Sequence, residues 1–282
     1  MDKVAIVGVG LIGGSFALAL RQAGFSGEII GVSSSSTIEA ARSLRVIDRA
    51  ASLSEAAAEC DLLYLAQPIR QILSTLAALK GNLKPGALVT DVGSTKSAIV
   101  AQAIEALGNG SFLGAHPMAG KELRGVAAAE AGLFQGRTYF LCAPAPEVLD
   151  HPVAEEFVEY IEKFGARPVL IGAEDHDRLV GMTSHLPQLA STALAAMLSR
   201  LLDPRNARNG AGPGLTDMTR LAQSSHDLWA DILSTNGPAI DRALSLYIKE
   251  LQEVRQRLAQ QDLQVRFEEA ATFAAIIRKR TS

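Results

Sequence analysis

The spacing of apolar residues divides the chain into two parts. Through about residue 172, short apolar runs rich in β-branched residues alternate with helical patterns. The predicted strands cover residues 4–7, 28–32, 62–66, 88–91, 112–115, 138–141 and 168–171, and the predicted helices cover 12–22, 38–44, 69–79, 97–107 and 153–164. Such an alternation indicates a mainly parallel sheet with helices on both faces. We therefore predict an α/β doubly wound domain over residues 1–172.

From residue 174 onward we find helical patterns and no convincing strand. Residues 186–202 are apolar nearly all round, which is typical of a helix buried on several sides. A Gly-, Pro- and Asn-rich break at 203–214 precedes helical patterns at 216–224, 228–233, 240–258 and 263–278. We expect residues 173–282 to form an all-helical domain that dimerises through the apolar helix. The alternative is a monomer that covers this helix with its own neighbours.

The composition narrows the class of protein. The 282 residues are 48% hydrophobic and carry a formal net charge of −3, which gives no reason to expect nucleic acid or an anionic membrane as a partner. No apolar run reaches the roughly 18 residues that span a bilayer, and no leader precedes the first strand. Cys60 and Cys142 lack metal-ligand spacing, so we expect packed, reduced thiols and no metal. These features favour a cytoplasmic protein.

A glycine-rich turn follows the first predicted strand. Gly8, Gly10 and Gly13 fit the pattern G-x-G-x-x-G, with Leu11 and Ile12 opening the next helix. Such glycines permit a tight turn, a close approach of the backbone to a pyrophosphate and close helix–strand packing. The helix N-terminus supplies free N–H groups for the phosphates. We predict a dinucleotide site; the alternative is a structural turn without a ligand.

The second predicted strand ends in a run of serines, "GVSSSST". An NAD-preferring site normally has an acid here, bonded to the ribose hydroxyls. Ser33 occupies that position and Ser34 and Ser35 follow, so no carboxylate repels a 2′-phosphate. We therefore expect NADP to be favoured over NAD. The groups offered to a 2′-phosphate are the serine hydroxyls, the N–H groups of a helix start near Thr37 and the Arg42 side chain on the next helix. The alternative is a solvated loop and a lax choice of cofactor.

Two later strands end in loops that should face the nicotinamide, because ligands bind outside the carboxyl ends of the strands in such sheets. Gln67 and Pro68 close one strand, and the sequence "DVGSTK" closes the next. Ser94 and Lys96 are the candidates for chemistry in that second loop. Ser94 or Thr95 could also cap the following helix.

The stretch "GAHPMAGKE" carries the candidate acid–base group. Pro117 favours an extended His116, which suits the end of a strand beside the cofactor. A neutral histidine base predicts a loss of rate on the acid side with an apparent pKa of about 6–7. Glu122 lies just beyond and either orients a ligand or is exposed.

The helical half adds three candidates. His185 precedes Pro187 and marks a kink facing the cleft or a packed polar residue. Arg220 is a possible bidentate carboxylate binder, or else a surface partner of Asp217. Trp229 is more typical of a core. The remaining histidines, at 151, 176 and 226, fit no motif and are predicted at the surface.

Five separated motifs make the chain resemble the prephenate/arogenate dehydrogenase family of tyrosine biosynthesis. They are "GVGLIGGS" (8–15), "DVGSTK" (91–96), "HPMAG" (116–120), "SHLP" (184–187) and "TDMTRLA" (216–222), and they extend over nearly the whole chain. The resemblance implies a Rossmann domain followed by a helical dimerisation domain. It also implies oxidative decarboxylation of a cyclohexadienol, with hydride transfer to NAD(P)+.

By this resemblance, His116 is the catalytic base, Ser94 its partner and His185 a second active-site histidine. Arg220 binds a substrate carboxylate, and Trp229 lies nearby. Thr216 stands where many relatives are basic, so the choice of prephenate or arogenate stays open. The chain leaves no room for a regulatory domain, so any feedback by tyrosine is expected at the active site.

Two other functions are compatible with parts of the sequence. A β-hydroxyacid dehydrogenase or imine reductase shares the layout, but the hydroxyacid enzymes usually rely on a lysine where this chain has His185 and Arg220. A non-catalytic NADPH-binding regulator would keep the fold without the chemistry.

Overall fold

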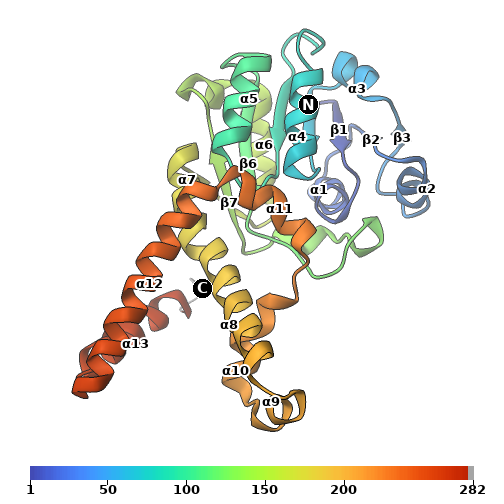
Figure 1. Ribbon diagram of the computed structural model, residues 1–282. Helices are drawn as coiled ribbons and strands as arrows, with labels where there is room; N and C mark the ends of the chain where they lie inside the picture. Colours follow the sequence, from blue (N-terminus) through green and yellow to red (C-terminus); the bar gives the residue numbers. More distant parts are fainter. Residues whose placement is uncertain (279–282) are drawn as a thin grey trace.

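The computed structural model describes residues 1–278 and has an α/β body from which a helical part extends (Figure 1). The sheet has eight strands in the order β3-β2-β1-β4-β5-β6-β7-β8. They are β1 (Lys3–Val7), β2 (Glu28–Val32), β3 (Arg49–Ala50), β4 (Leu62–Leu65), β5 (Leu88–Asp91), β6 (Phe112–Pro117), β7 (Thr138–Cys142) and β8 (Arg167–Leu170). Every pair is parallel except β6 and β7. The predicted doubly wound sheet is confirmed.

Helices cover both faces of this sheet, which explains why its strands are apolar without alternation. The helices of the body are α1 (Leu11–Gln22), α2 (Ser35–Ser43), α3 (Leu53–Glu59), α4 (Ile69–Ala78), α5 (Ser97–Leu107) and α6 (Pro152–Lys163). In β1, Val4 and Ile6 join the core under α1 and α6, whereas Ala5 and Val7 join the core under α3, α4 and α5. Each face therefore has its own apolar core.

Aromatic rings dominate the core under α1 and α6. The Phe16 and Tyr64 rings stack with centroids 3.8 Å apart, and Phe157 packs against both. The Tyr64 hydroxyl group hydrogen-bonds that of Tyr139 at 2.7 Å. The two phenols satisfy each other in a site without water access, as buried polar groups must.

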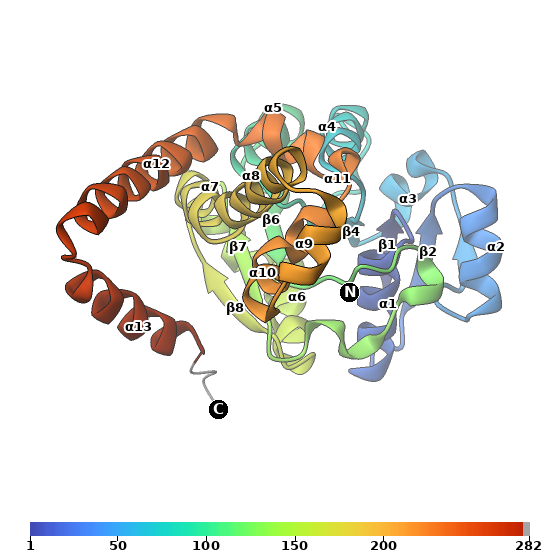
Figure 2. The ribbon, with the colours of Figure 1, turned by 60° about the horizontal axis from the view of Figure 1, so that its bottom comes forward.

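The second part of the chain is helical. It consists of α7 (Ala173–Val180), a π-helical turn (Gly181–His185), α8 (Leu186–Leu201), α9 (Pro204–Gly210), α10 (Pro213–Thr219), a 3-10 turn (Arg220–Gln223), α11 (His226–Thr235), α12 (Gly237–Gln260) and α13 (Gln264–Arg278). Figures 1 and 2 show α12 and α13 as an arm that reaches away from the body. None of the helices among residues 1–278 combines the length and apolar character that a membrane crossing needs.

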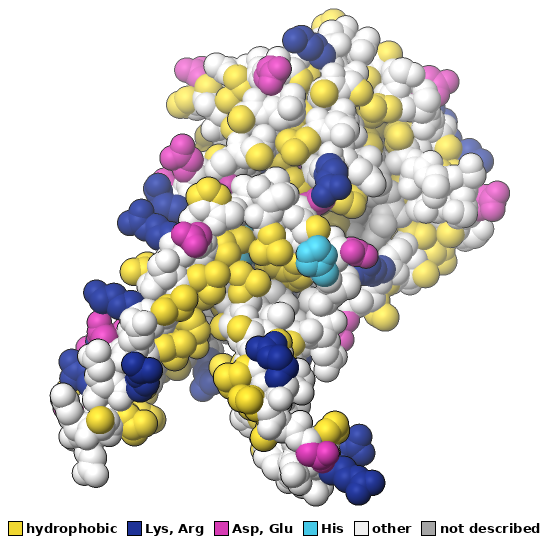
Figure 3. All heavy atoms as spheres, viewed as in Figure 1, with side chains coloured by type: hydrophobic (Ala, Val, Ile, Leu, Met, Phe, Trp, Pro, Cys, Tyr) yellow, Lys and Arg dark blue, Asp and Glu magenta, His cyan; other side chains and the backbone are white. Residues whose placement is uncertain are grey.

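Within one chain, α8 is poorly covered. Its fully buried residues are the polar Gln188 and Ser191, while Met197 and Leu201 are exposed. Neighbouring helices of the same chain therefore leave part of α8 uncovered. Apolar side chains also face solvent along the arm, as Figure 3 shows between α8 and α12. They are Leu246, Ile248, Leu251, Leu258, Val265, Phe267, Phe273, Ile276 and Ile277.

Several local features differ from the sequence-based expectations. The short elements β3 and α3 were not predicted, although Ser52 and Glu55 form a capping box at the start of α3. The predicted break at 203–214 contains α9, where the Asp203 side chain caps the helix and Pro204 occupies its first position. Cys60 and Cys142 are buried and unpaired, as predicted. Burial raises the pKa of each thiol to about 12.

Candidate active site

A cavity of about 290 Å³ opens where the carboxyl ends of β5 and β6 meet the helical part. The two halves of the chain line it together. The lining residues are Ser94, His116, Pro117, Met118, Ala119, Ser184, His185, Leu228, Trp229 and Ile232. The three residues predicted to be catalytic, Ser94, His116 and His185, are thus brought together from distant parts of the sequence.

His116 is held from behind by a second histidine. Its Nδ1 lies 2.9 Å from Nε2 of His176, and Nδ1 of His176 lies 2.9 Å from Oδ1 of Asp177. His176 is fully buried in α7, where the Phe140 ring packs edge-on against it. The expectation that His176 lies at the surface is wrong, because α7 packs this side against the sheet. The contact leaves Nε2 of His116 as the ring nitrogen available to a ligand in the cavity.

Burial lowers the pKa of both cavity histidines. The pKa of His116 falls well below its ordinary value of 6.5, mainly through desolvation and also through the neighbouring His176, Lys96 and His185. Desolvation likewise lowers the pKa of His185 to about 4. Both rings are therefore neutral near pH 7. The expected apparent pKa of about 6–7 for His116 is corrected downward.

The Asp177 carboxylate stays ionised despite its burial. Burial alone would raise its pKa, but hydrogen bonds from His176, Ser97 and Lys96 lower it. Its Oδ1 accepts the backbone N–H of Lys96 at 2.7 Å, and its Oδ2 accepts that of Ser97 at 2.8 Å. Asp177 therefore caps α5 from the helical part of the chain. The expectation that Ser94 or Thr95 caps this helix is wrong.

His185 is both buried and part of the cavity wall. It ends the π-helical turn before α8, so the helix changes its hydrogen-bond pattern where a kink was predicted. Its Nδ1 lies 3.1 Å from Nδ2 of Asn236, which also donates to the Asp177 carbonyl oxygen at 2.8 Å. The His185 ring meets Trp229 edge to face, with centroids 5.7 Å apart. Nε1 of Trp229 is buried and has no hydrogen-bond partner among the described residues.

Lys96 does not reach the cavity, which contradicts its expected contact with substrate. Its side chain is fully buried and forms an ion pair with Asp91, which is also fully buried. The ammonium group donates to the Ala115 carbonyl oxygen at 2.8 Å, and Asp91 accepts the Ala115 N–H at 3.1 Å. The pair thus fixes the backbone of β6 at Ala115, the residue before His116.

Glu122 and Arg220 are exposed and lie outside the cavity wall of a single chain. Among the described residues no ion pair joins Arg220 to Asp217, so the predicted surface pair is absent. Two buried side chains of α8 hold the 3-10 turn that begins with Arg220. Gln188 donates to the Leu221 carbonyl oxygen at 2.8 Å, and Ser191 accepts the Ala222 N–H at 3.1 Å.

The glycine turn between β1 and α1 fits a dinucleotide. Gly8 has φ +97°, and a Cβ on it would collide with the Ala66 carbonyl oxygen. A Cβ on Gly13 would collide with the backbone of Gly8, whereas Gly10 borders open space beside the start of α1. This geometry leaves room at Gly10 for a pyrophosphate, which Leu11, Ile12 and Gly13 would meet with helix N-terminal N–H groups. Gln67 packs beside Gly8, and Pro68 directly precedes α4.

The serine run forms the start of α2. Ser33 follows β2 and is exposed, and Ser34 is the N-cap residue with Oγ 3.0 Å from Oγ1 of Thr37. The helix begins at Ser35, earlier than predicted. Its first N–H groups therefore lie directly beyond the position where an acid would bind the ribose.

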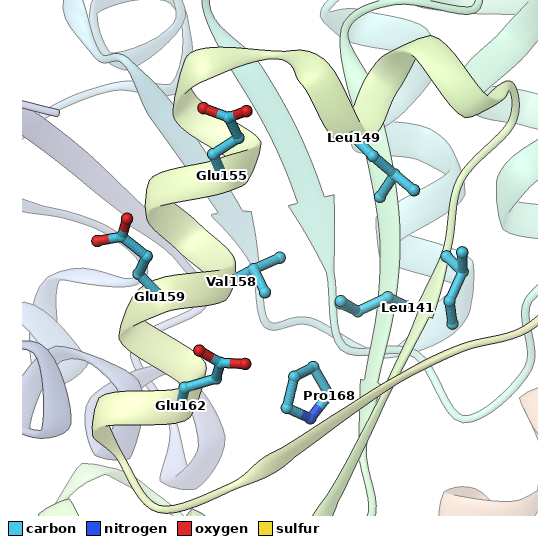
Figure 4. Close-up of a pocket in the computed structure, with 8 residues that line it drawn as sticks. Leu141, Leu149, Glu155, Val158, Glu159, Glu162 and Pro168 are labelled. Atoms are coloured by element: carbon cyan, nitrogen blue, oxygen red, sulfur yellow. The ribbon is translucent and has the colours of Figure 1, made fainter.

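A second cavity, about 420 Å³ in volume, lies between α6 and the strands β7 and β8 (Figure 4). Glu155, Glu159 and Glu162 follow one side of α6 along it. It is larger than the histidine cavity, but none of its lining residues belongs to the glycine turn or to the predicted catalytic set. The histidine cavity is therefore the candidate active site.

Comparison with known proteins identifies both parts of the chain. The model of the prephenate dehydrogenase nucleotide-binding domain matches residues 16–170, and that of the prephenate dehydrogenase dimerization domain matches residues 172–272. Prephenate dehydrogenase of Bacillus subtilis is 35% identical over 93% of this chain and 71% of its own length.

Two solved structures are also similar. Prephenate dehydrogenase of Aquifex aeolicus, in complex with hydroxyphenyl propionate and NAD+, has a TM-score of 0.88 at 30% identity and covers 98% of each chain. Arogenate dehydrogenase of Synechocystis has a TM-score of 0.83 at 31% identity, and the match covers 99% of this chain and 100% of the other. A 3-hydroxyisobutyrate dehydrogenase of Mycobacterium tuberculosis, at 15% identity and a TM-score of 0.56, shares the fold alone.

Proposed function

The chain belongs to the prephenate dehydrogenase family, and on that premise we propose that it oxidises and decarboxylates prephenate, arogenate or both, with hydride transfer to NAD(P)+. The observation that carries the proposal is the cavity in which Ser94, His116 and His185 meet. It lies at the same edge of the sheet as the glycine turn, where a nicotinamide would arrive.

In the proposed reaction, His116 is the general base. Its neutral Nε2 accepts the proton of the ring hydroxyl group as hydride leaves the same carbon. The bound nicotinamide nucleotide supplies the hydride acceptor. The ring carboxylate leaves as CO₂, its electron pair completes the aromatic ring, and the proton returns from His116 to the phenolic oxygen. Ser94 and His185 hydrogen-bond the substrate and hold its ring in place.

Further residues are proposed on the same basis. Trp229 contacts substrate, a role supported by its position in the cavity wall against His185. Arg220 binds a carboxylate with its exposed guanidinium group, on a turn fixed by α8. Glu122 follows the cavity residue Ala119 by three positions, and we propose that it influences the choice between a keto acid and an amino acid.

We further propose that NADP is accepted at least as well as NAD. The absence of an acid at Ser33 and the early start of α2 support this preference. Gly8, Gly10, Leu11, Ile12, Gly13, Ser33, Ser34, Ser35, Gln67, Pro68 and Ser94 are the proposed cofactor contacts.

The assembly is proposed as a homodimer of two-domain chains. The last strand of the sheet ends at Leu170 and α7 begins at Ala173, which supports domains of residues 1–172 and 173–282. The uncovered apolar residues of α8, α12 and α13 support pairing through the helical domain.

A steady-state assay tests the function by crossing prephenate and arogenate with NAD+ and NADP+. We expect reduced nucleotide and CO₂ to form in equal amounts with at least one pair. His116→Asn should reduce kcat by about 10²–10⁴-fold. His151→Asn is the matched control, because asparagine can keep the helix cap that His151 provides to α6. Activity with neither substrate, or full activity of His116→Asn, would overturn the proposal.

A further inference from the structure

Three side chains form a continuous line behind the cavity. Asp177 contacts His176, and His176 contacts His116, each across 2.9 Å. His176 is completely buried, with an exposed fraction of 0%. Neither His176 nor Asp177 lines the cavity, so they do not touch a substrate there.

The direction of each hydrogen bond follows from the last group in the line. The Asp177 carboxylate has no proton to donate, and two backbone N–H groups hold it in place. Nδ1 of His176 must therefore donate to it, which leaves Nε2 of a neutral His176 as an acceptor. Nδ1 of His116 must then be the donor. The proton of a neutral His116 sits on Nδ1, and its Nε2 carries a free lone pair toward the cavity.

The second cavity histidine, His185, also has a fixed tautomer. The Asp177 carbonyl oxygen can only accept, so Asn236 presents its amide nitrogen and not its amide oxygen to this group. The same nitrogen lies 3.1 Å from Nδ1 of His185, which must accept. The proton of a neutral His185 therefore sits on Nε2. One histidine reaches the cavity as an acceptor and the other as a donor.

We propose that His176, oriented by Asp177, is a positioning residue that sets the tautomer of His116, and that Asn236 sets the opposite tautomer of His185. The inference deepens the proposed function and rests on it for its kinetic consequence. The tautomers themselves are properties of the protein without substrate. Free imidazole has no such fixed choice, so loss of the His176 contact would leave His116 protonated in part on Nε2 and unable to act as base there.

The charged and titratable groups that face His116 come from three elements. They are His176 and Asp177 on α7, Lys96 at the start of α5 and His185 at the end of the π-helical turn. Lys96 is bound to Asp91 and does not contact His176.

Two substitutions of His176 separate its two contacts. His176→Gln places a polar atom near the former Nε2 and can still meet His116. His176→Asn places one near the former Nδ1 and keeps only the contact with Asp177. Asp177 itself is left unchanged because it also caps α5. His151→Asn serves as the control, since it lies outside the cavity and keeps its cap.

Nitrogen-15 NMR of histidine-labelled protein at pH 8 reads the tautomers directly, and His116→Asn assigns the His116 signals. We expect Nδ1–H for His116 and Nε2–H for His185 in the wild type and in His151→Asn. His176→Asn should shift His116 toward a mixture and lower kcat by about 10²-fold, with KM changed less than threefold. His176→Gln should lose less than about tenfold in kcat.

An unchanged His116 tautomer in His176→Asn would overturn the inference, and so would equal kcat losses in the two variants. If neither substrate is turned over by the wild type, the proposed function fails, but the NMR spectra still decide the tautomers. Thermal melts identify a variant that does not fold. In that case the wild-type spectrum alone decides, because Nε2–H on His116 contradicts the inference.

Discussion

At the scale of single residues, desolvation governs the cavity. His116 and His185 lie among apolar side chains and near other basic groups, so each ring resists protonation. A base that stays neutral in mildly acidic solution is suited to accept a proton from a hydroxyl group. The same burial places the titration of His116 below the pH range that the sequence motif alone suggested.

The first prediction concerns the pH dependence of His116. A pKa lowered below 6.5 means that the ring keeps its free lone pair until the pH falls further. We therefore expect kcat/KM to stay constant from about pH 8 to about pH 6.5 and to fall only below it. Initial rates across this range measure the profile. A midpoint at or above pH 6.5 would contradict the role of burial.

The second prediction concerns Ser33. A carboxylate at this position would bond the ribose hydroxyls of NAD and repel a 2′-phosphate. Ser33→Asp should therefore shift the ratio of kcat/KM for NADP to that for NAD toward NAD by at least tenfold, about 1.4 kcal/mol. Ser43→Asp, at the far end of α2, is the control. Undiminished use of NADP by Ser33→Asp would show that the serine run does not select the cofactor.

Residues within local motifs were predictable, and residues that depend on packing were not. Gly8 and Gly13 are required by their immediate neighbours, and His116 ends a strand, so short stretches of sequence carry the signal. His176 and Asn236 matter only because α7 and α12 bring them beside the cavity. The signal in the sequence that could have found His176 was its position next to Asp177, on a helix that precedes the "SHLP" motif.

At the scale of elements, the loop between β5 and α5 depends on charges that no local pattern explains. Lys96 and Asp91 are both fully buried, and between them they bind the backbone N–H and carbonyl groups of Ala115 in β6. Buried charges of this kind are strongly destabilising when one partner is lost. The pair therefore ties the position of His116 to the stability of the sheet.

The third prediction follows for Lys96→Met. Asp91 would be left as an unpaired buried carboxylate, so the free energy of unfolding should fall by about 3–5 kcal/mol. Urea denaturation with an unchanged slope measures this loss. Lys80→Met, at an exposed position after α4, should stay within about 0.5 kcal/mol of the wild type. A loss no larger than that of the control would contradict the pairing.

Element prediction succeeded where periodicity was strong. Apart from the two-residue β3, the strands of the sheet and the long helices were found nearly to their ends, because each has a continuous or amphipathic apolar pattern. The elements α3 and α9 were missed because each is short, 7 residues long, and is held mainly by its cap. The antiparallel step between β6 and β7 could not be read from the sequence, since strand direction depends on the path of the connecting loop.

At the scale of the whole molecule, the arm of α12 and α13 does not form a core by itself. Phe267 and Phe273 are exposed by 73% and 63%, and Arg266 of α13 is bound to Glu250 and Glu253 of α12. The two helices are thus held to each other by charges while their apolar side chains face outward. A second copy of the chain would remove these side chains from water.

The fourth prediction tests this surface. Leu251→Glu combined with Phe273→Glu should convert the proposed dimer to a monomer, because two carboxylates would be buried in the interface. Sedimentation velocity over a concentration series measures the assembly. Leu170→Glu, an equally exposed apolar position on β8, should leave it unchanged. The reverse result would move the interface to the β8 edge and its neighbouring cavity.

The two roles of Asp177 couple the docking of the two parts of the chain to the arrangement of the cavity. The Asp177 carboxylate on α7 accepts the backbone N–H groups of Lys96 and Ser97 at the start of α5, and the same carboxylate contacts His176 behind the proposed base. A chain whose two domains have not docked therefore lacks both the cap of α5 and the contact of His176 with His116. We expect the nucleotide-binding domain alone to bind nucleotide but to lack His176 and its contact with His116.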